Sequence, residues 1–366
     1  MKTPCFIIYL VGAMKGDSQK NINFQPLSKK ERAALKRRIT GSVYSYIRRR
    51  RLLKYGTGVS TILLLIFISI AFFSTPTPQP SSIESFAKTV NALEPSNKVQ
   101  LVLSDAHNIE ISEDNSAISY SSTGEQVQIG KEHSISQKTT YQEKTVFNTL
   151  IVPFGKRSEI VLSDGSKVWL NSGSKLIFPA QFEADIREVY LEGEAVFEVA
   201  HRQKQPFIVK SEHQEIEVLG TVFNVSNYKD DHAIYTVLQS GSVEIHLTDD
   251  KLFGTQKSIK IVPGTLAAFD KDEKTIKTQT VVTEPYFSWR DGIFIFKNDS
   301  LKSIMKKISR YYNVEVKIND KNLANETFSG YLDVKEDIEH VMQTIKATQS
   351  SEFNYELTQD NKLIIN

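Results

Sequence analysis

A run of 19 residues without a charged side chain, Tyr55 to Phe73, most constrains how this chain can fold. As an α-helix it would be roughly 28 Å long, close to the thickness of the hydrocarbon core of a bilayer. Arg48 to Arg51 and Lys54 precede the run, and the next basic residue after it is Lys88. Basic residues that flank a membrane helix stay on the cytoplasmic side. We therefore expect one transmembrane helix at residues 55–73, with the N-terminus inside.

A second apolar stretch, Cys5 to Met14, lies near the N-terminus. It has the length of a signal-peptide core, but cleavage there would place the basic residues 15–54 outside, against the positive-inside rule. We therefore favour translation from Met14 over translation from Met1. Cys5 is the only cysteine, so no disulfide can stabilise the residues beyond the predicted membrane helix.

The basic residues 15–54 carry 13 Lys and Arg against two acidic residues. Ser28 and Glu31 have the spacing of a capping box, and four apolar residues then recur at intervals of four, which predicts an amphipathic helix over residues 28–51. This apolar stripe consists of Leu35, Ile39, Val43 and Ile47. A lone helix cannot bury such a stripe, so it needs a lipid surface, a nucleic acid or the groove of a protein. Direct contact with DNA is disfavoured, because no turn and second helix follow.

The residues after the apolar run change from a Pro-rich linker, residues 74–84, to short alternating runs of polar and apolar residues. Asp164 and Gly165 stand between two such runs as a hairpin signal. Many short strands separated by Gly and Pro turns, without a helical period, predict an all-β domain over residues 85–282. The expected strands are 99–103, 108–112, 127–129, 159–162, 167–171, 188–191, 195–199, 207–210, 215–219, 222–225, 235–239, 242–246 and 257–262.

The last part of the chain, residues 287–366, alternates strand patterns with helical patterns. Ser300 and Asp337 are the expected N-caps of two helices. The order β-α-β-β-α-β-β predicts a small α+β domain.

Motifs for catalysis and for metal binding are missing from the sequence. There is no GxSxG, HExxH, CxxC or P-loop motif, and the seven histidines do not pair with metal ligands at the required spacing. Glu192 and Glu194 flank Gly193, and their alternation indicates one face of a strand rather than a catalytic pair. We predict no catalytic residue, no metal and no cofactor.

An ordered series of motifs between Val152 and Phe269, within a motif core at residues 149–269, resembles the FecR family of transmembrane anti-sigma regulators, in the form common in the Bacteroidetes. The motif residues are Pro153-Phe154-Gly155, Asp164, Gly165, Trp169, Asn171, Gly193, Glu194, Gly220 and Thr221. The C-terminal segment, which begins with Trp289 and Gly292, is similar to the secretin/TonB short N-terminal (STN) domain that follows FecR in this subgroup.

The resemblance implies a regulator of an extracytoplasmic-function (ECF) sigma factor. It would relay a signal from an outer-membrane TonB-dependent transporter across the bacterial inner membrane, with its N-terminus in the cytoplasm and its C-terminus in the periplasm. The stripe of residues 28–51 would dock on the sigma factor, without direct contact to nucleic acid. Many members have a longer cytoplasmic domain, so inhibition, activation and tethering of the sigma factor all stay open. The alternative is a structural envelope protein that uses its STN-like domain in a secretion or transport complex.

Some FecR relatives cleave themselves at a Gly-Thr bond that corresponds to Gly220-Thr221. The Thr221 hydroxyl would attack the preceding carbonyl, and water would hydrolyse the ester. The alternative is that Gly220 serves a tight bend between strands and Thr221 is a strand residue.

Overall fold

The computed structural model describes residues 28–73, 82–89, 96–103, 107–111, 117–131, 133–141, 144–248, 258–348 and 353–366. The chain divides into two compact units, Met1–Gln79 and Pro80–Asn366. The predicted start at Met14 and most of the predicted Pro-rich linker lie outside the described residues. The predicted domain boundaries stay predictions.

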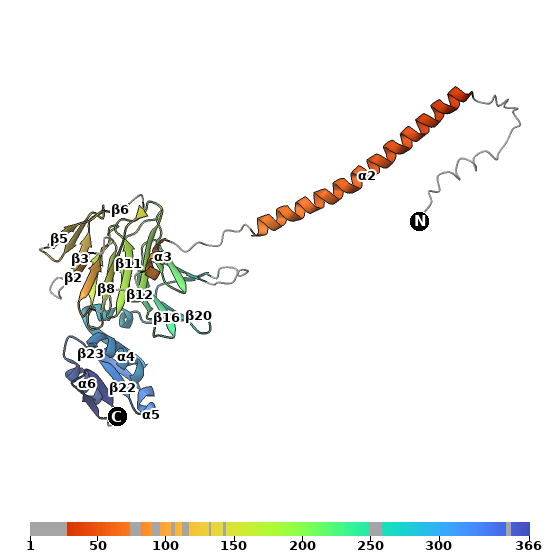
Figure 1. Cartoon of the computed structure of the whole chain (residues 1–366). Helices are drawn as coiled ribbons and strands as arrows, with labels where there is room; N and C mark the ends of the chain where they lie inside the picture. The colour runs from red at the N-terminus through yellow and green to blue at the C-terminus, as the bar shows by residue number, and fades with distance from the viewer. Residues whose placement is uncertain are drawn as a thin grey trace. The chain divides into compact units, whose positions relative to one another are not determined.

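The N-terminal unit contains one long described helix, α2 (Lys29–Phe73), which runs without a break (Figure 1). Its first turn has the predicted capping box, because the Glu31 N–H donates to Ser28 Oγ at 3.3 Å and the Ser28 N–H donates to Glu31 Oε2 at 3.0 Å.

The prediction of a transmembrane helix at residues 55–73 is wrong. In the part of the chain that the structure describes, no helix is both long enough and apolar enough to cross a membrane. The prediction treated the apolar run as an element of its own. In the structure the run shares one continuous helix with the basic residues Arg48 to Lys54, because nothing at Tyr55 interrupts the helical backbone.

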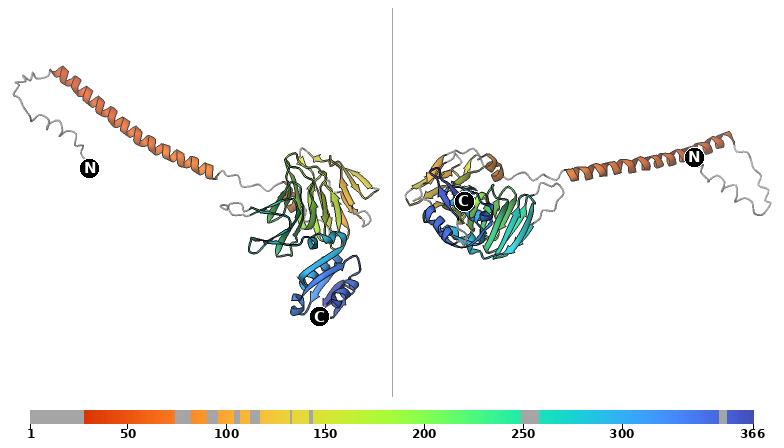
Figure 2. Two further views of the ribbon diagram at one scale, coloured as in Figure 1. Left: turned by 180° about the vertical axis from the view of Figure 1, so that it is seen from behind. Right: turned by 90° about the horizontal axis from the view of Figure 1, so that it is seen from below.

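Two β-sheets form the body of the second unit, and they share the strand β12 (Arg187–Glu198) (Figures 1 and 2). Sheet A has the order β2 (Asn108–Ile111), β1 (Val99–Val102), β8 (Phe147–Val152), β11 (Ser174–Pro179), β12, β13 (Phe207–Lys210), β14 (Gln214–Val218), β17 (Val243–Leu247) and β18 (Ser258–Ile261). Sheet B has the order β5 (His133–Ser136), β4 (Gln126–Ile129), β3 (Ala117–Tyr120), β9 (Ser158–Val161), β10 (Lys167–Leu170), β12, β15 (Val222–Asn227), β16 (Ala233–Ser240), β19 (Thr265–Asp270) and β20 (Thr275–Thr280). A short hairpin joins β6 (Thr140–Tyr141) and β7 (Lys144–Thr145).

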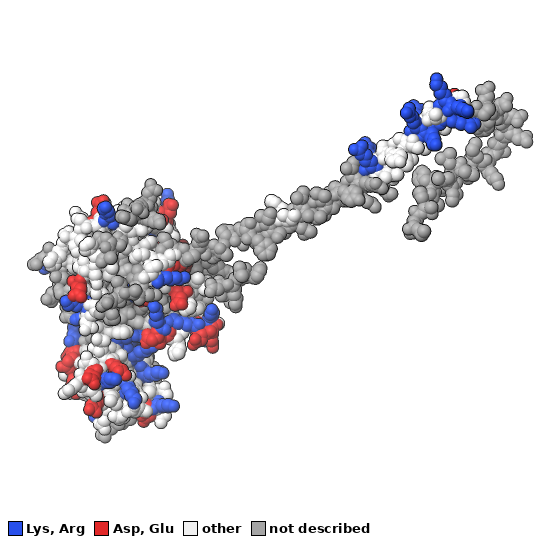
Figure 3. All heavy atoms as spheres, viewed as in Figure 1, with Lys and Arg blue, Asp and Glu red and all other residues white. Residues whose placement is uncertain are grey.

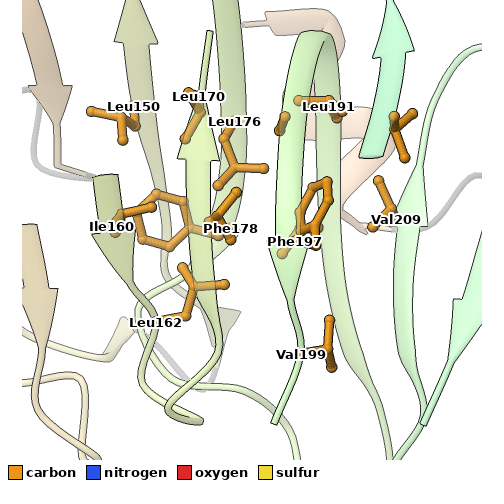
Figure 4. Close-up of a cluster of buried hydrophobic side chains, with 14 of the residues drawn as sticks. Leu150, Ile160, Leu162, Leu170, Leu176, Phe178, Leu191, Phe197, Val199 and Val209 are labelled. Carbon is orange, nitrogen blue, oxygen red and sulfur yellow. The ribbon is translucent and has the colours of Figure 1, made fainter. Parts of the chain in front are cut away.

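The core of this β-sandwich contains residues from strands of both sheets, and Figure 4 shows part of it. Along β12, Val189, Leu191, Ala195 and Phe197 are fully buried at every second position, as the pleat of a strand requires. Burial of each large side chain contributes about 1.5–3 kcal/mol to folding. Residues 80–366 contain no cysteine, so this unit depends on such burial rather than on disulfides for its stability.

Gly193 lies where β12 passes from sheet A to sheet B. The residues before it pair with β11 and β13, and those after it pair with β10 and β15. Its φ is +90°, and an added Cβ would lie 2.6 Å from the Cα of Ser174. The prediction of two strands with a turn at Gly193 is therefore wrong. The glycine is needed because one strand bends there into a backbone conformation that other residues rarely adopt.

Six strands of the sandwich were not predicted: β3, β5, β8, β11, β19 and β20. In β8 and β11 nearly every residue is buried, so the alternation that identifies a strand is missing. Strand β20 has the opposite character, because it is almost fully exposed and polar.

The C-terminal domain follows two 3-10 turns, η3 (Glu284–Tyr286) and η4 (Ser288–Asp291). Its elements are β21 (Ile293–Ser300), α4 (Leu301–Tyr312), β22 (Glu315–Ile318), α5 (Lys321–Asn325), β23 (Thr327–Asp333), α6 (Ile338–Ala347), β24 (Tyr355–Leu357) and β25 (Lys362–Ile365). Ser300 and Asp337 cap α4 and α6, as predicted. The observed order differs from the predicted one by the additional short helix α5.

Candidate functional site between the β-sandwich and the C-terminal domain

A second hydrophobic cluster joins the outer face of sheet B to the C-terminal domain. Val196 of β12 and Val237 of β16 are fully buried, although they point away from the core of the sandwich. They pack in one cluster with Phe287, Trp289 and the apolar side of α4. The outer face of this sheet is thus a docking surface for the C-terminal domain.

Arg310 of α4 makes the main polar contact across this interface. Its Nη2 atom lies 2.8 Å from Oδ1 of Asp230 and 2.8 Å from Oδ1 of Asp231, both in the loop between β15 and β16. Its guanidinium group also lies over the ring of Tyr228, 3.6 Å from the ring centre. Burial would raise the pKa of the Asp230 carboxyl group, but hydrogen bonds and charge from Lys306 and Arg310 outweigh burial and lower that pKa. The contact is therefore a charged clamp between a loop of the sandwich and a helix of the C-terminal domain.

Two further arginines connect the same surfaces. From the sandwich, Arg157 donates hydrogen bonds to the carbonyl oxygen of Trp289 at 2.7 Å and to the hydroxyl of Tyr311 at 2.9 Å. From the C-terminal domain, the guanidinium group of Arg290 lies 4.9 Å from the ring centre of Trp169. Such cation–π contacts contribute about 0.5–2 kcal/mol each, depending on their burial. Each side of the interface thus contributes an arginine that contacts an aromatic residue on the opposite side.

Glu194 lies on the same outer face of β12, because its neighbour Ala195 faces the core. Its carboxylate accepts hydrogen bonds from Asn171 Nδ2 at 2.9 Å and from Asn224 Nδ2 at 3.1 Å. Burial raises the pKa of the Glu194 carboxyl group above its ordinary value, while the two amides and the cations of α4 oppose this rise. The site thus combines a partly buried titratable group with a charged clamp in α4.

The substitution Glu194→Gln is expected to change how stability depends on pH. Because the folded pKa is raised, the folded protein keeps this proton where the unfolded chain has lost it, so the group's contribution to stability falls as pH rises through that window. Gln does not titrate, so the variant should gain stability relative to the wild-type protein as pH rises. Urea unfolding between about pH 4 and pH 8 measures this, with Glu198→Gln at the exposed end of β12 as the control. If the free energy of unfolding of Glu194→Gln and of the wild-type protein changed with pH in parallel, the raised pKa assigned to Glu194 would be contradicted.

The motif residues from Asp164 onward lie in three regions of the structure. Trp169, Asn171, Glu194 and Trp289 come together at the interface, with Gly193 directly before Glu194. Gly292, with φ +78°, ends the turn η4 that carries Trp289. The sequence alone did not indicate that these residues share one surface.

Asp164 and Gly165 lie elsewhere, in the turn between β9 and β10. Asp164 Oδ2 is 2.7 Å from Nη1 of Arg187, and the two side chains are 1% and 0% exposed. Ser166 Oγ donates to the same carboxylate oxygen at 2.6 Å. This buried ion pair fixes the hairpin to the start of β12, and its role is structural.

Gly220 and Thr221 form the third region, in the bend between β14 and β15. An added Cβ on Gly220 would lie 2.7 Å from the Cα of His201, so only glycine fits this close approach. The Thr221 hydroxyl donates to the carbonyl oxygen of Ser242 at 2.9 Å. The geometry agrees with the tight bend that the sequence offered as one alternative, although Thr221 comes just before the strand rather than in it.

The predicted partner-binding stripe lies on α2, and all four of its side chains are exposed. Leu35, Ile39, Val43 and Ile47 are 51%, 55%, 49% and 43% exposed. Lys and Arg gather along the same part of the helix (Figure 3).

Sequence reasoning did not identify Arg157, Tyr228, Asp230, Asp231 and Arg310 as site residues. Arg310 and Asp231 lie 79 positions apart, and no spacing rule connects them. The nearest signal was the pair of adjacent acids in a loop, which by itself is typical of a solvated turn. In the described ranges, no group of three His, Cys, Asp or Glu residues is arranged to hold a metal ion.

Two family models match parts of the chain. Residues 148–244 match the model described as FecR protein, and residues 293–365 match the model described as FecR, C-terminal. The fold is thus FecR-like and mostly β. The region that matches the FecR model thus precedes the region that matches the FecR C-terminal model, and the second region docks on the first.

Two crystal structures of a candidate anti-sigma factor from Parabacteroides distasonis, at 1.65 and 2.50 Å resolution, share this fold. They have TM-scores of 0.53 and 0.52 and are 24% identical to this chain. Each match covers 60% of this chain and 98% of the other. No curated protein sequence matches the chain.

Proposed function

We propose that this protein is a non-enzymatic regulator of an ECF sigma factor, and that helix α2 makes the contact. The observation that carries the proposal is the exposed apolar stripe on α2, in a chain that also carries two FecR domains. An amphipathic helix of this kind binds by placing its apolar face in a hydrophobic groove. The many Lys and Arg beside the stripe favour a groove with an acidic rim.

We further propose that the two FecR domains receive the signal from the signalling domain of an outer-membrane TonB-dependent transporter. The support is the motif series at residues 149–269 together with the matches to the FecR and FecR C-terminal models. The docked interface is the feature best suited to respond, because a partner that competes for α4 or for sheet B would loosen the clamp. The predicted location, with the N-terminus in the cytoplasm and the C-terminus in the periplasm, stays a prediction.

Co-purification of the full chain with the ECF sigma factors of its own organism tests the first part of the proposal. We expect one of them to be retained by the wild-type protein. A protein that retains no sigma factor, and that instead forms a stable assembly with envelope proteins, would favour a structural role.

The substitution Thr221→Ala is expected to leave the protein as one full-length chain. The Thr221 hydroxyl is bonded to the carbonyl oxygen of Ser242, so its loss should cost about 1 kcal/mol of stability, and Thr221→Ser should restore most of it. Mass spectrometry of the protein from cells and urea unfolding measure the two effects. Two fragments that meet between Gly220 and Thr221 in the wild-type protein, and that are lost in Thr221→Ala, would instead establish self-cleavage.

A further inference from the structure

The short helix α3 (Ser82–Thr89) is the first described element after α2, and it packs on β11 and β12 of sheet A. Ile83 and Ala87 are buried against Ile177, and this small cluster also includes Phe147 and Tyr190. The ring centres of Phe86 and Phe147 lie 5.4 Å apart. The cluster is separate from the sandwich core and from the interface of the C-terminal domain. Helix α3 thus has a small apolar seat of its own.

The ion pair between α3 and sheet A shares its cation with other carboxylates. Glu84 of α3 lies 3.8 Å from Nζ of Lys210 in β13. The same ammonium group is closer to two other carboxylates, Glu215 at 2.8 Å and Glu188 at 3.3 Å, which both belong to sheet A. When α3 leaves, Lys210 therefore keeps two partners, and no buried charge is left uncompensated. The main attachment is the apolar cluster in which Ile83 of α3 and Ile177 of β11 are both fully buried.

We propose that α3 is a detachable strap on sheet A, which sets the length of chain between the sigma-binding helix α2 and the sandwich. An eight-residue helix is too short to be stable by itself, so α3 unfolds when it leaves its seat. Its residues then span up to about 26 Å instead of about 12 Å. A longer connection lets the sandwich lie farther from helix α2 and from a partner bound there. This regulatory consequence rests on the proposed function, whereas the strap itself does not.

Hydrogen exchange of the whole protein, read by mass spectrometry, tests the strap. In the wild-type protein we expect amides of residues 84–89 to exchange at least about tenfold faster than those of β12, since local opening needs less free energy than unfolding of the sandwich. The substitution Ile83→Asp should remove the remaining protection of α3 and leave β12 unchanged. Ser85→Asp adds the same charge to an exposed position of α3 and is the matched control.

Equal protection of α3 and β12 in the wild-type protein would overturn the proposal, and this result does not depend on whether Ile83→Asp folds. Loss of protection in β11 and β12 along with α3 in Ile83→Asp would also overturn it. The mean distance between a fluorescent label on α2 and one on the sandwich should increase in Ile83→Asp and stay constant in Ser85→Asp. An unchanged distance with an open strap would refute the regulatory consequence. A wild-type protein that binds no sigma factor would refute the proposed function and leave the exchange result intact.

Discussion

Replacing Arg187 by Met is expected to destabilise the FecR domain by about 3–5 kcal/mol, the usual cost of breaking a buried ion pair from one side. The guanidinium group is 0% exposed, and besides Asp164 it donates to the carbonyl oxygens of Ala200 at 2.8 Å and Gln205 at 3.0 Å. Methionine fills much of the same volume but leaves the carboxylate of Asp164 buried without its cation. Urea unfolding followed by far-UV circular dichroism measures the loss.

Two controls separate the buried pair from charge removal in general. Lys175→Met removes a lysine that lies 3.1 Å from Glu192 on the outer side of sheet A, where both side chains keep some exposure. It should cost less than about 1 kcal/mol. The double variant Arg187→Met with Asp164→Asn should recover a large part of the loss, because no buried charge remains. A cost for Arg187→Met as small as that of Lys175→Met would contradict the structural role of the pair.

Replacing Arg310 by Ala is expected to weaken the docking of the C-terminal domain by about 2 kcal/mol, because it removes charged hydrogen bonds to Asp230 and Asp231 and a cation–π contact with Tyr228. Solvent screens part of this interaction at Asp230, which is largely exposed, and Lys306 still neutralises the two acids.

The two tryptophans of the chain report this change directly, because Trp169 and Trp289 both belong to the interface cluster. We expect their fluorescence to shift to longer wavelength in Arg310→Ala at a lower urea concentration than in the wild-type protein, before the sandwich unfolds. Lys302→Ala, at an exposed position of the same helix, is the matched control. Coincident fluorescence transitions in Arg310→Ala and the wild-type protein would mean that the clamp contributes little to docking.

The sequence predicted those parts of the fold that local patterns determine. The helix α4 was predicted because Leu301, Ile304, Met305 and Ile308 recur at helical spacing. In the structure all four side chains are buried. The turn at Asp164-Gly165 was predicted because Asp-Gly is a frequent hairpin turn. In the structure Gly165 has the positive φ, +87°, that such a turn needs. In both cases the residues that decide the structure are neighbours in the chain.

The predictions that failed depend on context beyond a local window. Gly193 carries the signal of a turn, but the residues on either side of it pair with four different strands and keep it inside one strand. The apolar run from Tyr55 to Phe73 was interpreted as an element of its own, with the basic residues as its flank, whereas in the structure both belong to one helix. The motif pattern singled out Asn171, Glu194 and Trp289, yet only the docking of two domains places them near Arg310. Such docking depends on the shapes of two folded surfaces, which no spacing in the sequence encodes.

The most direct test of the proposed function is the affinity of the whole protein for its ECF sigma factor, measured by calorimetry. The double variant Ile39→Asp with Val43→Asp should bind at least about 100-fold more weakly than the wild-type protein, since burial of each apolar side chain contributes about 1.5–3 kcal/mol. Ser45→Asp, on another face of the same helix, should bind within about threefold of the wild-type protein. Equal binding by the double variant and Ser45→Asp, or no binding by the wild-type protein, would contradict the assignment of α2 as the sigma-factor contact.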